Sequence, residues 1–162
     1  MVAKSRDVRL LLDNIRSVHN VGSIFRTAET IGISRIYCLG TTPVPVDRFG
    51  RKRGDFAKVA LGAEDIVPWE HTRVSTALIR RLKEDDFEIV ALEQTASSVD
   101  YKRVRRHRKM LIVVGNEVDG VSKNLLEVSD VVAEIPMSGK KESLNVSVAT
   151  GIFLFRLMDV DL

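Results

Sequence analysis

The chain has 162 residues, of which 44% are hydrophobic and 29% charged, and its formal net charge is +3. These values predict one globular domain over residues 1–162 with no added RNA-binding domain, and no apolar run is long enough to span a bilayer. The single cysteine, Cys38, excludes an internal disulfide, and no signal-peptide pattern is present, so a reducing, cytoplasmic compartment is expected.

Apolar runs and amphipathic segments alternate from the N-terminus onward. Residues 8–12 predict a buried strand, and Asn20 is the expected N-cap of a helix that ends at Gly32. Its apolar residues recur three and four positions apart, which predicts one buried stripe. These residues are Val21, Ile24, Phe25, Ala28 and Ile31. Residues 36–39 predict a second strand, and residues 40–55 predict a long loop.

The rest of the chain continues this alternation. The expected helices are 56–62, 74–83 and 121–128, and the expected strands are 65–69, 87–92, 110–114 and 131–135. Several of these strands are apolar throughout, so both of their faces must be covered. The pattern predicts an α/β fold whose mainly parallel sheet carries helices on both faces.

The C-terminal segment, residues 143–158, predicts a helix with almost no charge before Arg156. Its apolar residues cover every face, so the helix must be buried all round, by the chain's own elements or by a second subunit. Ser143 and Asn145 stand at its entrance. Both could cap the helix, or they could lie at the rim of an enclosed site.

Polar residues follow four expected strands, at positions 13–14, 93–94, 115–117 and 136–143. Ligands of parallel α/β sheets bind at the carboxyl ends of the strands, so these loops are candidate site elements. A P-loop around Gly139 is excluded because positions 134 and 141 hold Glu and Lys. No G-x-G-x-x-G or G-x-S-x-G motif is present, and the few His and Cys residues offer no metal cluster. Two possibilities remain: a cofactor that is held mainly by backbone loops, or no cofactor at all.

Positive charge is concentrated in two segments, residues 48–58 and 102–109. The first contains Phe49 and Phe56, and the second surrounds His107. Clusters of this kind on a nearly neutral chain favour an anionic polymer such as RNA, although charged loop surfaces are the plain alternative.

Three motifs resemble those of one family, and they cover nearly the whole chain in the family's order. They are NIRxxxNVGxxxRTAE at 14–29, VGNExxG at 114–120, and IPM followed by ESLNVS at 135–147. The chain is thereby similar to the SpoU-type, or TrmH-like, RNA methyltransferases of the SPOUT superfamily. The resemblance implies methyl transfer from S-adenosyl-L-methionine to a ribose 2′-hydroxyl in tRNA or rRNA. It also implies a C-terminal trefoil knot and a homodimer, with neither membrane nor metal involved.

The resemblance also assigns roles to residues. The implied cofactor-binding residues are Leu92, Glu93, Gly115, Asn116, Ile135, Met137, Ser143 and Leu144. The implied catalytic residues are Arg26, Asn20, Glu117, Ser143 and Asn145. Arg26 would act as a base or as a phosphate clamp, and Gly115 would let the cofactor approach closely. Composition adds a candidate RNA-binding set of Arg48, Arg51, Lys52 and Arg53.

Other functions are compatible with parts of this pattern. One is a SPOUT-fold module that binds RNA without catalysis, and another is a SPOUT enzyme that methylates a base nitrogen. A third, from a different class, is a flavodoxin-like regulator that binds a small molecule.

Overall fold

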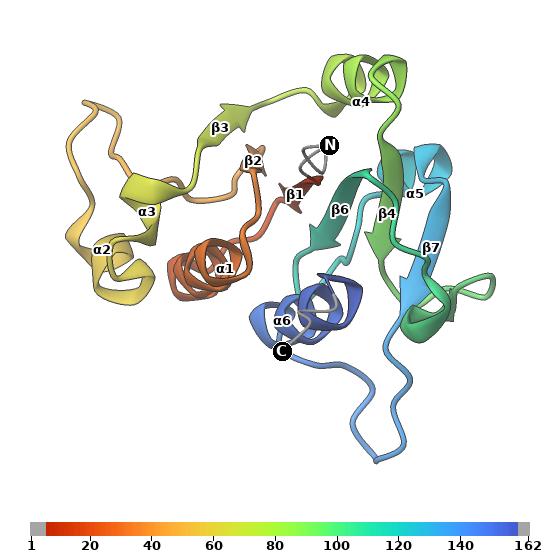
Figure 1. The fold of residues 1–162 in the computed structure, drawn as a ribbon. Helices are drawn as coiled ribbons and strands as arrows, with labels where there is room; N and C mark the ends of the chain where they lie inside the picture. The colour runs from red at the N-terminus through yellow and green to blue at the C-terminus, as the bar shows by residue number, and fades with distance from the viewer. Residues whose placement is uncertain (1–5, 159–162) are drawn as a thin grey trace.

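The computed structural model describes residues 6–158, so the predicted domain of residues 1–162 extends beyond it at both ends. The strands are β1 (Asp7–Asp13), β2 (Arg35–Leu39), β3 (Trp69–Thr72), β4 (Glu88–Leu92), β5 (Val99–Asp100), β6 (Lys109–Gly115) and β7 (Val131–Glu134). They form one sheet in the order β3-β2-β1-β6-β4-β7-β5, and every pairing between neighbours is parallel (Figure 1). The predicted α/β class is therefore confirmed.

Helices cover both faces of this sheet. They are α1 (Val18–Ile31), α2 (Gly54–Ala60), α3 (Ala63–Ile66), α4 (Ser75–Glu84), the 3-10 turn η1 (Tyr101–Arg103), α5 (Lys123–Val128) and α6 (Val146–Met158). The larger core packs one sheet face against α1, α2, α3 and α6, and the smaller core packs the other face against α4 and α5 (Figure 1). Leu10 and Leu11 of β1 belong to different cores, which is why an uninterrupted apolar run was required there. Within residues 6–158, no helix is long and apolar enough to cross a membrane.

Helix α1 begins at Val18, three residues before the start that an Asn20 cap would give. Ser17 is the N-cap, and its hydroxyl accepts a hydrogen bond from the backbone N–H of Asn20 at 3.1 Å. The prediction that Asn20 caps the helix is wrong, because the equally suitable Ser17 lies one turn upstream. The Asn20 side chain is therefore available for contacts outside the helix. The predicted end at Gly32 is confirmed, with φ of 81°.

One further prediction is wrong, at the third strand. Residues 65–69 were expected to form a strand, but Ala63–Ile66 is a helical turn and β3 begins at Trp69. Pro68 cannot extend a helix, and its carbonyl accepts from Ile36 N, which starts the strand pairing one residue later. The two-residue β5 escaped prediction because so short a segment carries no periodicity.

Helix α6 is buried on one side only. Phe153, Leu154 and Leu157 are almost fully buried in the larger core. Val148, Ile152 and Phe155 are instead 49%, 38% and 50% exposed. Burial of every face by the chain's own elements is therefore wrong for the single chain, which leaves the second-subunit interpretation. The threading of this segment into a trefoil knot stays a prediction.

Candidate functional site

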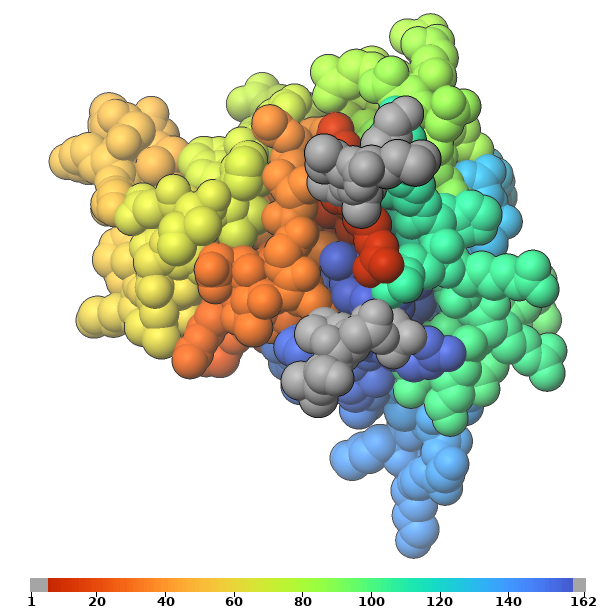
Figure 2. All heavy atoms as spheres, viewed as in Figure 1, coloured from red at the N-terminus to blue at the C-terminus, as the bar shows by residue number. Residues whose placement is uncertain are grey.

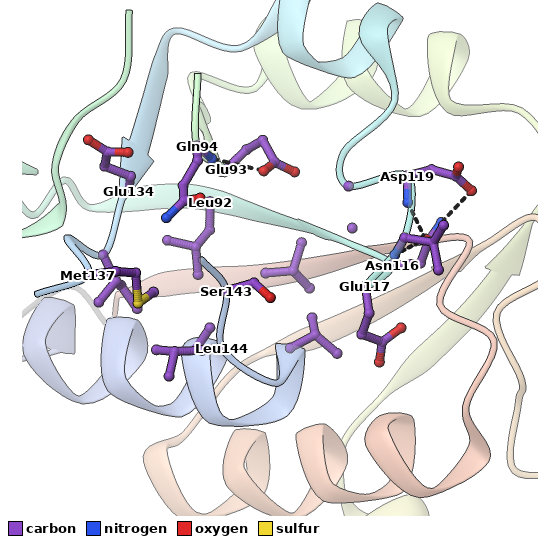
Figure 3. A pocket seen from close by; sticks show the side chains of 17 residues that line it. Leu92, Glu93, Gln94, Asn116, Glu117, Asp119, Glu134, Met137, Ser143 and Leu144 are labelled. Carbon is purple, nitrogen blue, oxygen red and sulfur yellow. Dashed lines mark hydrogen bonds between the residues drawn. The ribbon is translucent and has the colours of Figure 1, made fainter. Parts of the chain in front are cut away.

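A pocket of about 250 Å³ lies at the carboxyl ends of β4, β6 and β7, and the loop that precedes α6 forms one of its walls (Figure 3). The lining residues come from four segments of the chain. They are Leu92 to Gln94, Val114 to Gly120, Glu134, Ile135 and Met137, and finally Ser143, Leu144, Val146 and Ala149. Residues far apart in sequence therefore meet at the position where parallel α/β sheets bind ligands.

All eight residues predicted to hold the cofactor are in this lining. Their assigned roles stay predictions, but their shared location is a structural fact. Sequence reasoning missed other lining residues, among them Val118, Asp119 and Glu134. Each of these lies within two residues of a predicted one, so the signal that could have found them was proximity to the motifs.

The fourth polar strand end, at Asp13 and Asn14, does not reach the pocket. Asp13 is buried, and its carboxylate accepts hydrogen bonds from Ser122 N at 2.7 Å and from the Asn14 amide at 2.9 Å. Asn14 has φ of 51° and accepts from Thr41 N. These two residues therefore hold neighbouring loops together, as ordinary polar turns do.

Among residues 6–158, the side chains that line the pocket are negative but not positive. Glu93, Glu117, Asp119 and Glu134 line it, and no Lys or Arg of this part of the chain does. Apolar side chains, including Leu92 and Leu144, supply much of the remaining surface (Figure 3). A cationic ligand with an apolar ring suits such a lining, whereas a phosphate-bearing nucleotide would lack any positive partner.

Gly115 is required by the chain itself. A Cβ atom at Gly115 would lie 2.1 Å from the carbonyl carbon of Gly120, where no real atom fits. Gly120 has φ of 67° and lies against the carboxylate of Glu93. The tight turn that follows β6 therefore demands glycine at position 115. The expectation that Gly115 also lets the cofactor approach closely stays a prediction.

Glu93 ties two walls of the pocket together. Its carboxylate accepts hydrogen bonds from Val121 N and from Gln94 N, each at 2.8 Å. The loop after β4 is thus fastened to the turn after β6. Both carboxylate oxygens are already engaged with backbone N–H groups, which gives Glu93 a role in shaping the pocket.

A chain of polar side chains connects α1 with the entrance of α6. The amide of Asn145 donates to Oδ1 of Asn20 at 3.1 Å, and the amide of Asn20 donates to the carboxylate of Glu117. Asn145 also accepts from Ser147 N at 2.9 Å, so it caps α6 as well. Ser143 lines the pocket nearby (Figure 3). Four of the five predicted catalytic residues are therefore gathered at one place.

Arg26 is the one predicted catalytic residue that belongs neither to the pocket lining nor to this chain of hydrogen bonds. It is the ninth residue of the 14-residue helix α1, so it lies in the middle of the helix and not near the end that holds Asn20. Its side chain is exposed, is absent from the pocket lining, and forms no ion pair within residues 6–158. The chain alone does not bring Arg26 to the pocket.

Carboxylates outside the loop of residues 48–53 neutralise part of its positive charge. Three of its cations form ion pairs at 2.8, 2.5 and 2.7 Å, namely Arg51 with Asp47, Lys52 with Asp65, and Arg53 with Asp55. Phe49 is 66% exposed, and the guanidinium groups of Arg48 and Arg51 lie over its ring. Phe56 is fully buried and packs edge-on against Phe25. Of these two phenylalanines, only Phe49 is therefore available to a partner.

Cysteine and metal chemistry find little support in the described part of the chain. Burial raises the pKa of the Cys38 thiol to about 12, so the reactive thiolate is suppressed. Among residues 6–158, no group of three His, Cys, Asp or Glu side chains is placed to hold a metal ion.

The family model described as the SpoU rRNA Methylase family matches residues 7–155. The tRNA (guanosine(18)-2′-O)-methyltransferase of Aquifex aeolicus is 32% identical over 94% of this chain and 69% of that protein. The 23S rRNA (guanosine-2′-O-)-methyltransferase RlmB of Escherichia coli K12 is 34% identical over 90% of this chain, which spans 57% of that protein.

Solved structures share the fold. The A. aeolicus TrmH/SpoU tRNA modifying enzyme superposes with a TM-score of 0.84 at 29% identity, over 96% of this chain and 76% of that one. The AdoMet-bound rRNA methyltransferase of Sinorhizobium meliloti gives a TM-score of 0.83 at 28% identity, over 98% of this chain and 58% of that one.

Proposed function

Because the chain belongs to the SpoU rRNA methylase family, we propose that it transfers a methyl group from S-adenosyl-L-methionine to a ribose 2′-hydroxyl in tRNA or rRNA. One observation carries this proposal: the second and third family motifs line a single acidic pocket, and hydrogen bonds to Glu117 and Asn145 join Asn20 of the first motif to it. The relatives named above are guanosine 2′-O-methyltransferases, which supports guanosine as the first nucleotide to test.

The pocket chemistry fits this cofactor. S-adenosyl-L-methionine supplies an electrophilic methyl group on a sulfonium and also carries an ammonium group. Leu92, Ile135 and Leu144 provide apolar surface for its purine, while Glu117 and Glu134 provide negative charge for its cationic part. Loops joined by Glu93 preorganise these contacts, which reduces the entropy lost on binding.

Arg26 acts as a phosphate clamp and reaches the pocket from a second copy of the chain. A guanidinium remains protonated in proteins, so it is a poor base but a good bidentate partner for a phosphate. It holds the ribose in line with the methyl group, and such positioning can contribute about 7 kcal/mol or more. Exposure of Arg26 outside the pocket of its own chain is what supports a donor in trans.

The second copy packs on α6. Val148, Ile152 and Phe155 follow one another at helical spacing, so they form a continuous apolar strip that water would otherwise cover. A homodimer that buries this strip satisfies the all-apolar composition of the helix. Such a dimer meets its RNA substrate in the cytoplasm.

The loop of residues 48–53 contacts RNA through Arg48 and Phe49. Ion pairs with the flanking Asp47 and Asp55 hold the loop in place and leave the Phe49 ring exposed for stacking on an unpaired base. Substitution of Phe49 by Ala is therefore expected to weaken RNA binding more than reversal of the already paired Arg53.

The test is incubation of the full chain with labelled S-adenosyl-L-methionine and, separately, with tRNA and rRNA pools. Digestion to nucleosides should then yield a labelled 2′-O-methylnucleoside from one pool. Binding of both cofactor and RNA without methyl transfer would favour the alternative, an RNA-binding module that keeps the fold. Failure to bind the cofactor would contradict the proposal.

A further inference from the structure

We propose that Lys102, Arg103, Arg105 and Arg108, here called the basic ridge, form a second RNA-contacting surface that binds backbone phosphates away from the pocket. The inference rests on an RNA substrate, as proposed above, and adds where that substrate extends. The ridge begins after β5, whose Asp100 pairs with Glu134 of the pocket lining, and it ends at Arg108, before the start of β6. None of its four residues is among the site residues predicted from the sequence.

The charge of the ridge is not neutralised by the chain. The segment from Lys102 to Lys109 contains six Lys and Arg residues and no carboxylate. The four ridge side chains form no ion pair within residues 6–158, where His107 with Glu88, at 3.5 Å, is the only pair from this segment. Three cations of the loop of residues 48–53, by contrast, are paired with nearby carboxylates. Unpaired exposed cations are the ones that can displace counterions from phosphates.

Hydrogen bonds and an apolar contact anchor the basic ridge to the folded domain. Nη1 of Arg106 donates to the carbonyl oxygen of Met158 at 2.6 Å, and Nη2 of Arg156 donates to that of Lys102 at 3.3 Å. Val104 packs against the larger core. These contacts tie the segment to the last turn of α6, and Figure 2 shows the green-to-teal chain around residues 100–110 standing out on the surface. A fixed array of cations loses less entropy on binding than a flexible tail.

The distance between Arg108, at the far end of the ridge, and the pocket indicates how long a bound RNA must be. Strand β6 runs from Lys109, next to the ridge, to Gly115, in the pocket lining. Six steps along a strand span about 20 Å, which is longer than a single nucleotide and requires a structured RNA to reach both places. None of the large exposed apolar side chains of the described chain lies between Tyr101 and Lys109, so an inserted membrane contact is disfavoured.

The experiment compares two triple variants of equal charge change. The first is Arg103→Glu/Arg105→Glu/Arg108→Glu, which leaves the anchoring side chains of Arg106 and Lys109 untouched. The control is Arg73→Glu/Arg80→Glu/Arg81→Glu, on exposed positions at and before α4. Binding of a long RNA duplex of arbitrary sequence is measured by fluorescence anisotropy at several salt concentrations. Vesicles rich in anionic lipid form a second arm.

The ridge variant should bind the duplex at least about tenfold more weakly than the control, and the slope of log affinity against log salt should fall by roughly two to three. Equal binding by the two variants would overturn the proposal, and so would a loss confined to the vesicles. Cofactor binding, followed by calorimetry, should be unchanged in both variants. If the unsubstituted chain bound no cofactor but the ridge variant still lost duplex binding, the proposed enzymatic function would fail while the surface stood.

Discussion

Asn145 donates a hydrogen bond from its side-chain amide to Oδ1 of Asn20 at 3.1 Å, which joins residues 125 positions apart. Because Asn20 in turn donates to the carboxylate of Glu117, one amide side chain aligns the start of α1, the turn after β6 and the entrance of α6. All three motifs of the family are thus connected through Asn20. The predictions below follow from this connection and from the surfaces around it.

Replacing Asn20 by Asp should disable catalysis more than folding. A carboxylate at position 20 would face the carboxylate of Glu117, and this repulsion would shift the alignment of the site. A displacement of about 1 Å can lower turnover about 100-fold. We expect a loss of that order in methyl transfer at neutral pH. Acidification that protonates one of the two facing carboxylates should remove the repulsion and restore part of the activity. The exposed Asn124→Asp variant is the control, and equal turnover by the two would contradict the role of Asn20.

Arg26→Ala should abolish methyl transfer while calorimetry still detects the cofactor. Arg26 is exposed and unpaired within the described residues, so its removal should leave the melting temperature unchanged. Because a Lys cannot form a bidentate clamp, Arg26→Lys should recover only a small part of the activity. Arg81→Ala, on an exposed face of α4, serves as the control. Normal turnover by Arg26→Ala would remove this residue from the mechanism.

Gly115→Ala should damage the pocket, whereas Gly139→Ala should not. The added methyl group would collide with the backbone of Gly120 at 2.1 Å, but at Gly139 nothing lies within 4 Å. Forcing atoms into a filled space costs about 1–3 kcal/mol or more. Chemical denaturation should show this destabilisation, and cofactor affinity should fall in the first variant alone. Two equally stable variants would show that the turn after β6 can relax.

Phe155→Glu should convert a dimer into a monomer. The strip of Val148, Ile152 and Phe155 is the proposed contact between copies, and a charge buried there would be strongly unfavourable. Light scattering coupled to size-exclusion chromatography should report half the mass of the unsubstituted chain. Val74→Glu, at another exposed apolar side chain, should leave the mass unchanged. Methyl transfer should be lost along with the dimer, because Arg26 would then lack a pocket to enter.

Glu88→Gln should raise stability at neutral pH. Burial raises the pKa of Glu88, the charge of Asp130 raises it further, and His107 opposes both when protonated. A carboxyl group whose pKa is raised in the folded state stabilises the fold at low pH, and this contribution is lost as the pH rises from 4.5 through the raised value. The melting temperature of the variant should therefore exceed that of the unsubstituted chain above this range, and the two should converge below it. The exposed Glu84→Gln is the control.

The sequence predicted the parts of the fold that local pattern encodes. Continuous apolar runs located β1, β4 and β6, and three-four spacing located α1 and α4. Where a prediction was wrong, another residue competed for the same task. Ser17 replaced Asn20 as the cap of α1, and Pro68 moved the start of β3. The sequence cannot rank such competitors, because the outcome depends on which backbone groups meet in three dimensions.

The site was predicted through motifs, and its internal contacts were not. Sequence reasoning placed Glu93 and Gly115 against the cofactor, whereas the structure first uses them to close turns. It also grouped Arg26 with the catalytic residues, and Arg26 is absent from the pocket lining of the single chain. Contacts across long loops and between copies produce no periodic pattern in a single sequence. The sequence therefore could not predict these contacts.

Asn145 has consequences for how substitutions there are interpreted. The same side chain caps α6 through Ser147 N and fixes Asn20, so truncation would loosen a helix and misalign an amide at once. Lost turnover in Asn145→Ala would therefore be an ambiguous reporter of mechanism. Asn145→Asp separates the two effects. An aspartate retains the side-chain oxygen that caps α6, but it lacks the N–H group that donates to Oδ1 of Asn20.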